Sequence, residues 1–306
     1  MKAFEGKQFD VEHVLSLYAL SFITIPAAGL YDKEGLAQFG DLVKDCHIYV
    51  VGFVPKIDLK DIKLDGVNLI MTFEVLGKRY DLKWIMDEGV GLVEKDGAWF
   101  LTKDGELADP PGHELCLDRL NREFGTGKFL VKYIGQAYGK DGARNALDRL
   151  VKHEKLQEIA IKGVPEGHHL QIVMFAIATT RVLTSFNPFA KDKSKSDERI
   201  GHGLDKLFGT TKKERVALYE AALIRYFMPV FNLEFKDSFP STNLKILQDC
   251  YEKDFSGVVA EILFEEEFPL TLYSETVKPK DHHTAYFDLH EDEARRTFFA
   301  APPKEA

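Results

Sequence analysis

The segment FLVKYIGQ, residues 129–136, sets the expectation for the fold of the region around it. Its apolar and β-branched side chains predict a strand, because such side chains fit a half-buried pleated surface. Gly135 begins a loop that contains two more glycines, Gly139 and Gly142. A glycine at this place lets other groups approach the backbone closely. Tyr133 lies in the strand itself, and its hydroxyl needs a hydrogen-bond partner if the ring is buried.

A helical pattern follows this loop, from about Ala143 to Ile159. Arg149 and His153 are four residues apart within it, so we expect both side chains on one face of a single helix. A guanidinium can hold a phosphate through two hydrogen bonds, and an imidazole can accept a proton near neutral pH. We interpret this face as a candidate site for anion binding and acid–base chemistry. The alternative is a pair of ordinary surface residues.

A second helix is predicted for Thr211–Met228, because Thr211 can cap it and Pro229 ends it. Glu220 stands in an otherwise apolar run of this helix. A buried carboxylate is costly unless it is paired or binds a metal. Mg²⁺ and Mn²⁺ prefer oxygen ligands. Glu220 is therefore a candidate metal ligand, and the alternative is an exposed glutamate that pairs with Arg215 or Arg225.

In this order the segments resemble the GIY-YIG nuclease family, over roughly residues 129–232. Tyr133-Ile134-Gly135 is similar to the second half of the motif that names the family. Glu220 and the later Pro229-Val230-Phe231-Asn232 are similar to its Glu…Pro-x-(Tyr/Phe)-Asn ending. The resemblance implies a metal-dependent endonuclease with one Mg²⁺ or Mn²⁺ ion on Glu220. It implies catalytic roles for Tyr133, Arg149, His153, Glu220 and Asn232, with Gly135 allowing close backbone approach.

The first half of that motif, Gly-Ile-Tyr, is expected about ten residues before Tyr133. Residues 119–125 stand there, and they hold no tyrosine. In the family this tyrosine commonly acts as a general base or positions water. We therefore expect Tyr133, Tyr138 or His153 to take that role. The alternative is a catalytically inactive nucleic-acid-binding or assembly protein that keeps the nuclease fold.

The charge is unevenly distributed along the chain. The net charge is −9, and residues 1–118 hold 12 basic and 21 acidic side chains. Residues 119–216 hold 19 basic and 11 acidic side chains, a local charge of +8. A local basic surface suits a nucleic-acid partner whatever the total charge is, although a solvated face is the alternative. We expect DNA rather than RNA as the partner. The candidate nucleic-acid contacts are Lys132, Arg144, Lys152, Lys191, Lys193 and Lys195.

The expected fold class is α+β, with a small antiparallel sheet flanked by helices and a separate N-terminal α+β domain. Helices are expected at Val11–Leu20 and Lys33–Lys44, followed by an antiparallel meander. The segment DPPG at 109–112 interrupts regular structure and suggests a boundary. We expect a recognition or regulatory domain at 1–112 and a nuclease domain with a C-terminal extension at 113–306. Residues 170–179 fit either a strand or a buried helix.

Composition places the chain in a broad class. Hydrophobic residues make up 45% and charged residues 29%, as in an ordinary soluble protein. No apolar run approaches the eighteen residues of a membrane-spanning helix, so no membrane partner is expected. The three cysteines are far apart in the sequence and form no metal motif. These features predict a cytoplasmic location, and they leave the oligomeric state open.

Overall fold

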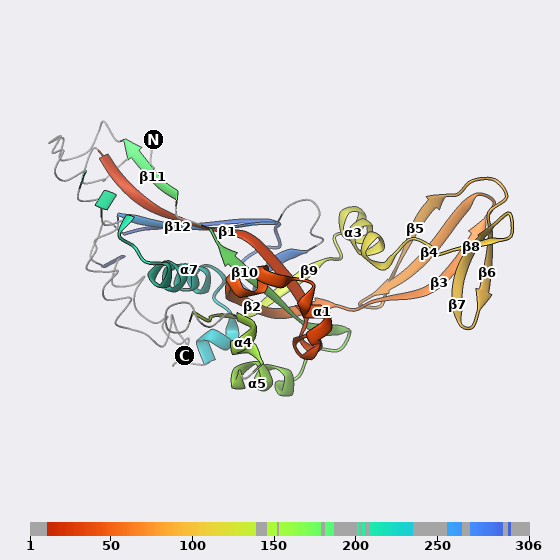
Figure 1. Ribbon diagram of the computed structural model, residues 1–306, viewed down its shortest axis with the longest axis horizontal. Coiled ribbons are helices and arrows are strands. Elements are labelled where there is room, and N and C mark those ends of the chain that lie inside the picture. Colours follow the sequence, from red (N-terminus) through yellow and green to blue (C-terminus); the bar gives the residue numbers. More distant parts are fainter. Residues whose placement is uncertain are drawn as a thin grey trace.

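The computed structural model describes residues 11–138, 146–151, 153–178, 181–186, 208–234, 256–264 and 270–289, with 201, 204–205 and 293–294. In these residues the protein is mixed α+β and is organised around one eight-stranded sheet (Figure 1). The strand order is β13-β9-β2-β10-β1-β12-β14, and β11 also pairs with β1. The bounds are β1 Val11–Pro26, β2 Cys46–Pro55, β9 Lys128–Gln136, β10 His168–Ile177, β11 Arg181–Phe186, β12 Gly257–Leu263, β13 Thr271–Tyr273 and β14 His282–Asp288.

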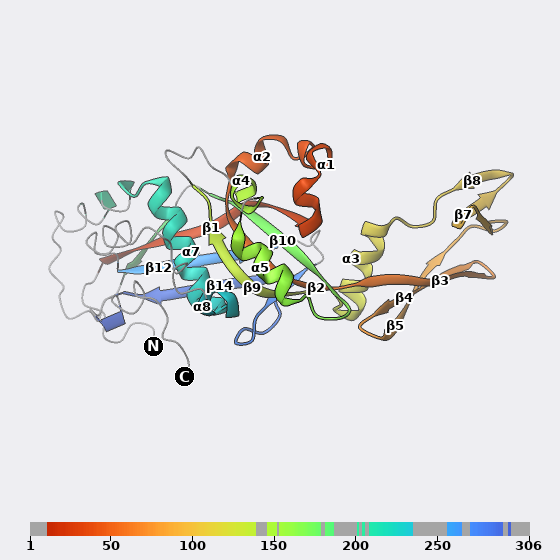
Figure 2. The ribbon, with the colours of Figure 1, turned by 90° about the horizontal axis from the view of Figure 1, so that it is seen from below.

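Helices cover both faces of this sheet. Alternate side chains of β2 enter two different cores, because successive residues of a strand point to opposite faces. Ile48 and Val50 join the core that contains helix α7, whereas Tyr49 and Val51 join the core on the other face. Figure 2 shows α1, α2 and α4 grouped beside β1 and β10. The helices are η2 Ala27–Tyr31, α1 Lys33–Ala37, α2 Gly40–Asp45, α4 Ala146–Leu150, α5 Glu154–Lys162, α7 Lys212–Phe227 and α8 Val230–Glu234.

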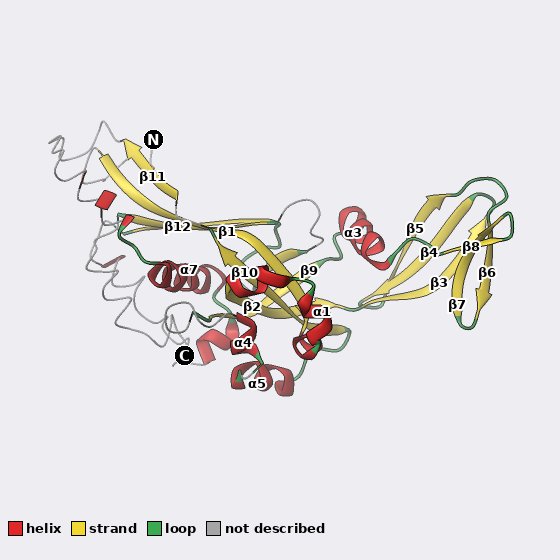
Figure 3. Cartoon of the chain, viewed as in Figure 1, coloured by secondary structure: helices red, strands yellow, loops and turns green. Residues whose placement is uncertain are grey.

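An arm of two small sheets projects away from the large sheet (Figures 1 and 3). It is inserted in the chain between β2 and β9, and helix α3 (His113–Phe124) leads back from it to β9. The first of its sheets has a small core of its own with α3, which includes Leu69, Leu82 and Leu120. Its strands are β3 Ile57–Asp65, β4 Asn68–Val75, β5 Lys78–Ile85, β6 Gly91–Lys95, β7 Ala98–Lys103 and β8 Glu106–Ala108.

The expectation of a mixed α+β fold is confirmed, but the expectation of a small sheet is wrong. The central sheet is large, because β1, β12 and β14 extend it beyond β10. The expected boundary at residue 112 also does not divide this sheet. β1 and β2 precede that boundary, and both are hydrogen-bonded to strands that follow it. The two expected units therefore share one sheet.

Three of the expected helices differ in the structure, and the one expected at Lys33–Lys44 is two short helices, α1 and α2. Residues 11–20, expected to be helical, are the first part of strand β1. The strand is sixteen residues long, and residues 13–17 in its first part are all buried, so burial there does not alternate between the two faces. The single helix expected from Ala143 to Ile159 is two helices, α4 and α5. The chain leaves helical geometry at His153, which caps α5 instead of continuing α4.

Other expectations are confirmed. Helix α7 begins after Thr211, and its first turn forms a capping box with Glu214. The helix ends just before Pro229, as the sequence predicts. Residues 170–179, which fitted a strand or a helix, belong mainly to strand β10. An antiparallel meander after the helical residues 33–44 is also present, over strands β3 to β8 of the arm.

Asn232 pairs with the outer edge of β9. Strand β13 reaches only residues 128–130 of β9, so the later part of that edge needs other partners. The Asn232 side chain supplies them for Ile134: its Oδ1 accepts from the Ile134 backbone N–H, and its Nδ2 donates to the Ile134 carbonyl, each at 2.8 Å. Asn232 is only 1% exposed. This amide therefore attaches α8, which follows α7, to the strand that carries Tyr133.

We expect Asn232→Ala to destabilise the protein by about 2 to 4 kcal/mol. The change leaves a buried N–H and a buried carbonyl of Ile134 without partners, and each costs about 1–3 kcal/mol. Urea unfolding measures the effect. The matched control is Asn68→Ala, which removes an exposed side-chain hydrogen bond to the Asp65 carbonyl and should cost at most about 0.5 kcal/mol. Equal losses in the two variants would contradict the assigned role of Asn232.

Candidate functional site

Tyr49 lies directly against the backbone of Gly135. The two residues are register partners in the antiparallel pair β2–β9, and Val51 is opposite Tyr133. A Cβ atom added to Gly135 would lie 2.5 Å from the Tyr49 hydroxyl and 2.6 Å from Cζ of its ring. Position 135 therefore requires glycine because a tyrosine ring occupies the space of its side chain.

Three rings meet at this place. The ring centroids of Tyr49 and Tyr133 are 6.2 Å apart, and that of His153 lies 5.7 Å from the first and 5.5 Å from the second. All three side chains are buried. The sequence places Tyr133 and His153 in the candidate site, and the structure brings them together with Tyr49.

Arg149 lies at the same cluster, on α4. Its guanidinium lies near enough to the Tyr49 hydroxyl to lower the pKa of that group. Its Nε is buried and has no hydrogen-bond acceptor among the residues that the structure describes. A buried donor without an acceptor is uncommon and asks for a ligand or another explanation. A phosphate oxygen is an acceptor that suits a guanidinium.

Burial raises the pKa of the Tyr49 hydroxyl well above its usual range, and the nearby Tyr133 and Glu220 raise it further. The charge of Arg149 acts in the opposite direction and favours the phenolate. At neutral pH this hydroxyl therefore holds its proton. The phenolate form becomes more available as the pH rises.

Glu220 is held by Gln136, the residue that follows Gly135. The Gln136 Nε2 donates to Glu220 Oε2 at 2.8 Å. Glu220 is 3% exposed. Burial raises its pKa well above the usual value, whereas Gln136 and the charge of Arg149 lower it. The expected pairing with Arg215 or Arg225 is therefore replaced by a contact with Gln136.

His153 is the N-cap residue of α5. Its Nδ1 accepts a hydrogen bond from the Leu156 backbone N–H at 3.2 Å, which caps α5. In a neutral imidazole the proton is then on Nε2. The nitrogen that accepts is already used by the helix, so this arrangement favours a structural and packing role beside Tyr49 and Tyr133.

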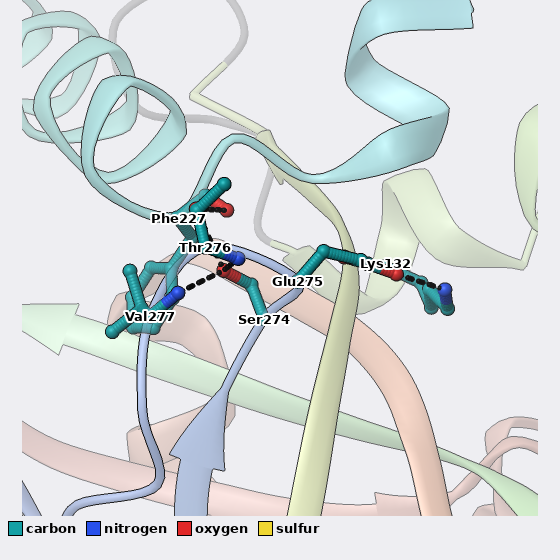
Figure 4. A network of polar contacts seen from close by, with 6 residues as sticks. All are labelled: Lys132, Phe227, Ser274, Glu275, Thr276 and Val277. Carbon is teal, nitrogen blue, oxygen red and sulfur yellow. Dashed lines mark hydrogen bonds and ion pairs between the residues drawn. The ribbon is translucent and has the colours of Figure 1, made fainter.

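Lys132 is paired within the protein. Its Nζ lies 2.5 Å from a carboxylate oxygen of Glu275 and 5.9 Å from the centroid of the Phe53 ring, and its side chain is 15% exposed. Figure 4 shows Glu275 in a turn that also binds the end of α7, where Thr276 Oγ1 donates to the Phe227 carbonyl. A phosphate would have to compete with Glu275 for Lys132. The other expected nucleic-acid contacts, Arg144, Lys152, Lys191, Lys193 and Lys195, lie outside the described residues.

Tyr138, another candidate base, packs beside His47, with 4.9 Å between their ring centroids.

Sequence reasoning missed two members of the cluster, Tyr49 and Gln136. The signal for Tyr49 was the pair Ile48-Tyr49 in an apolar strand. It was overlooked because the arm separates that strand from Tyr133 in the sequence.

Within the described ranges, no three His, Cys, Asp or Glu side chains gather as a metal-binding group. The candidate centre has one carboxylate, Glu220, together with the amide of Gln136. In the same ranges no helix has the length and apolar character needed to cross a bilayer.

Glu220→Gln should stabilise the fold increasingly as the pH rises. Below the ordinary glutamate pKa of 4.5, Glu220 is protonated in the folded and unfolded states and carries no penalty. Above it the unfolded state ionises, while burial keeps the folded carboxyl protonated, so the parent protein loses stability with increasing pH. Urea unfolding at pH 5 and pH 8 should show the advantage of Glu220→Gln growing between these values. An advantage that is the same at both pH values, or equal growth in the exposed control Glu94→Gln, would contradict it.

Comparisons of the chain with protein-family models, with curated proteins and with solved structures gave no match.

Proposed function

We propose that the protein is a metal-dependent endonuclease that hydrolyses phosphodiester bonds in nucleic acid, with DNA as the favoured substrate, and that it resembles the GIY-YIG nucleases. The observation that carries the proposal is that Tyr49 and Arg149 lie on one side of the Gly135 backbone and Glu220, held by Gln136, lies on the other, near enough for their charges to shift one another's pKa. Residues far apart in the sequence converge there on one hydroxyl, one cation and one carboxylate. These are the groups that phosphodiester hydrolysis needs for proton transfer, phosphate binding and metal binding.

The position of Tyr49 supports the resemblance to the GIY-YIG nucleases, which was weakened by the absence of a first Gly-Ile-Tyr segment shortly before Tyr133. The first half of the motif was expected about ten residues before Tyr133 and was not found there. His47-Ile48-Tyr49 lies instead in β2, antiparallel to Tyr133-Ile134-Gly135 in β9. We propose that this segment is the missing half, with His47 in place of the first glycine, and that the arm is an insertion between the two halves.

The arrangement of helices also supports a nuclease core within the larger sheet. β9, β2 and β10 are consecutive antiparallel strands. Helix α7 packs in the core on one face, and α4 and α5 pack in the core on the other. A small antiparallel sheet flanked by helices is what the resemblance implies, and we propose that these elements correspond to it within the larger sheet.

The residues present fit one divalent cation. Glu220 is a buried carboxylate whose ionised form is disfavoured until a positive charge compensates it. Mg²⁺ or Mn²⁺ bound there would polarise a phosphoryl oxygen and stabilise the leaving oxyanion. Arg149 would bind a non-bridging oxygen through its Nε, the buried donor that has no acceptor among the described residues. Tyr49, once deprotonated, would accept the proton of the attacking water.

A second reading is a nucleic-acid-binding or assembly protein without catalysis. Two observations favour it: Glu220 is almost inaccessible, and Glu275 neutralises Lys132. Incubation with supercoiled plasmid and with single-stranded substrates, with and without Mn²⁺, separates the two readings. Metal-dependent cleavage supports the nuclease, and binding without cleavage supports this alternative.

Tyr49→Phe should abolish metal-dependent cleavage, because the hydroxyl is the proposed proton acceptor. The cleavage rate of the parent protein should rise with pH above neutrality as the phenolate forms, up to about tenfold per pH unit. His153→Ala should keep this rise if the protein remains folded, because His153 is not the base in this account. Tyr80→Phe in the arm is the matched control and should retain full activity. A Tyr49→Phe protein with the parent pH–rate profile would rule Tyr49 out as the base.

Arg149→Ala should lower the cleavage rate by about 10²–10³, the typical cost of removing a preorganised group that stabilises transition-state charge. The loss should be similar at all pH values where the parent is active, because arginine remains charged throughout. Arg119→Ala, on α3 beside the arm, is the control. A loss from Arg149→Ala that disappears at high pH would show that its role is confined to the ionisation of Tyr49.

A further inference from the structure

Gln136 holds Glu220 from one side. It lies at the end of β9, it is partly exposed, and its side-chain amide donates to the Glu220 carboxyl group at 2.8 Å. Ile134, two residues earlier, packs in the core of α7. Gln136 faces the same helix, whereas Tyr49 approaches Gly135 from the other face of the sheet. The glutamine and the tyrosine thus lie on opposite sides of one backbone position.

The amide oxygen of Gln136 lies close to the carboxylate. The nitrogen and oxygen of an amide are about 2.2 Å apart, given its bond lengths. Since the nitrogen is 2.8 Å from Glu220 Oε2, the oxygen lies within about 5 Å of that atom. Two oxygens that bind one Mg²⁺ are each about 2.1 Å from it, so they can be up to about 4 Å apart. A rotation of the Gln136 side chain that brings its amide oxygen to within about 4 Å of Glu220 Oε2 would meet this limit.

The chemistry of the pair suits a hard cation. Mg²⁺ and Mn²⁺ take carboxylate and amide oxygens and keep several waters. An amide supplies an oxygen without adding a second buried negative charge beside Glu220. From these observations we infer that the amide oxygen of Gln136 is a second protein ligand of the divalent cation on Glu220. This inference rests on the proposed function, because it concerns the same cation.

Direct titration with Mn²⁺, followed by the electron paramagnetic resonance signal of the free ion, tests the inference without any activity assay. The variants are Gln136→Met, which keeps the length but removes the oxygen, and Gln136→Glu, which keeps an oxygen but removes the N–H donor. The control is Gln157→Met on the exposed side of α5. Circular dichroism and thermal unfolding establish that each variant is folded.

A ligand role predicts that Gln136→Met weakens Mn²⁺ binding by about 10- to 100-fold, whereas Gln136→Glu binds at least as tightly as the parent. Parent affinity in Gln136→Met would overturn the inference and leave the proposed function standing. Weaker binding by Gln136→Glu than by Gln136→Met would also overturn it, because it would show that the amide acts only as a donor to Glu220. A parent protein that does not bind Mn²⁺ would overturn both.

Discussion

The pairing of β2 with β9 is the constraint on which the candidate site depends. Side chains alternate between the two faces of a sheet, so a slip of one residue would move Tyr49 away from Arg149 and Tyr133. The close contact of the Tyr49 ring with Gly135 fixes this register, since any other residue at 135 would collide with the ring. The Asn232 amide then fixes α8, which follows α7, to the same strand. Glu220 is thereby placed beside Gln136.

The electrostatics of the cluster indicate function more than stability. Burial raises the pKa values of both Tyr49 and Glu220. The positive charge of Arg149 lowers both of them. Groups with pKa values perturbed by burial and by specific charges gather at functional sites. Such an arrangement costs folding free energy, which is common where a protein has to bind a ligand. A phosphate at Arg149 and a cation at Glu220 would compensate the charges that the fold leaves unbalanced.

Local patterns in the sequence predicted much of the site but little of its connectivity. Helix α7, with its cap and its terminal proline, followed from residues near one another, and so did strand β9. Arg149 and Glu220 were identified because a charged residue in an apolar helix is unusual. Tyr49 was missed because the arm is inserted between β2 and β9, so the sequence contains no short spacing between Tyr49 and Tyr133 that would reveal the pairing of these strands. β1 was predicted as a helix because a strand buried on both faces has no alternation to reveal it. The contact of Gln136 with Glu220 depends on tertiary packing alone.

The central claim is that Glu220 and its neighbours bind one divalent cation for phosphodiester hydrolysis. Anomalous diffraction from crystals soaked in MnCl₂ tests it most directly. The account predicts one anomalous peak about 2.1–2.2 Å from a carboxylate oxygen of Glu220, and no peak in crystals of Glu220→Gln treated in the same way. Manganese bound elsewhere, with none at Glu220 in well-diffracting crystals, would contradict the account.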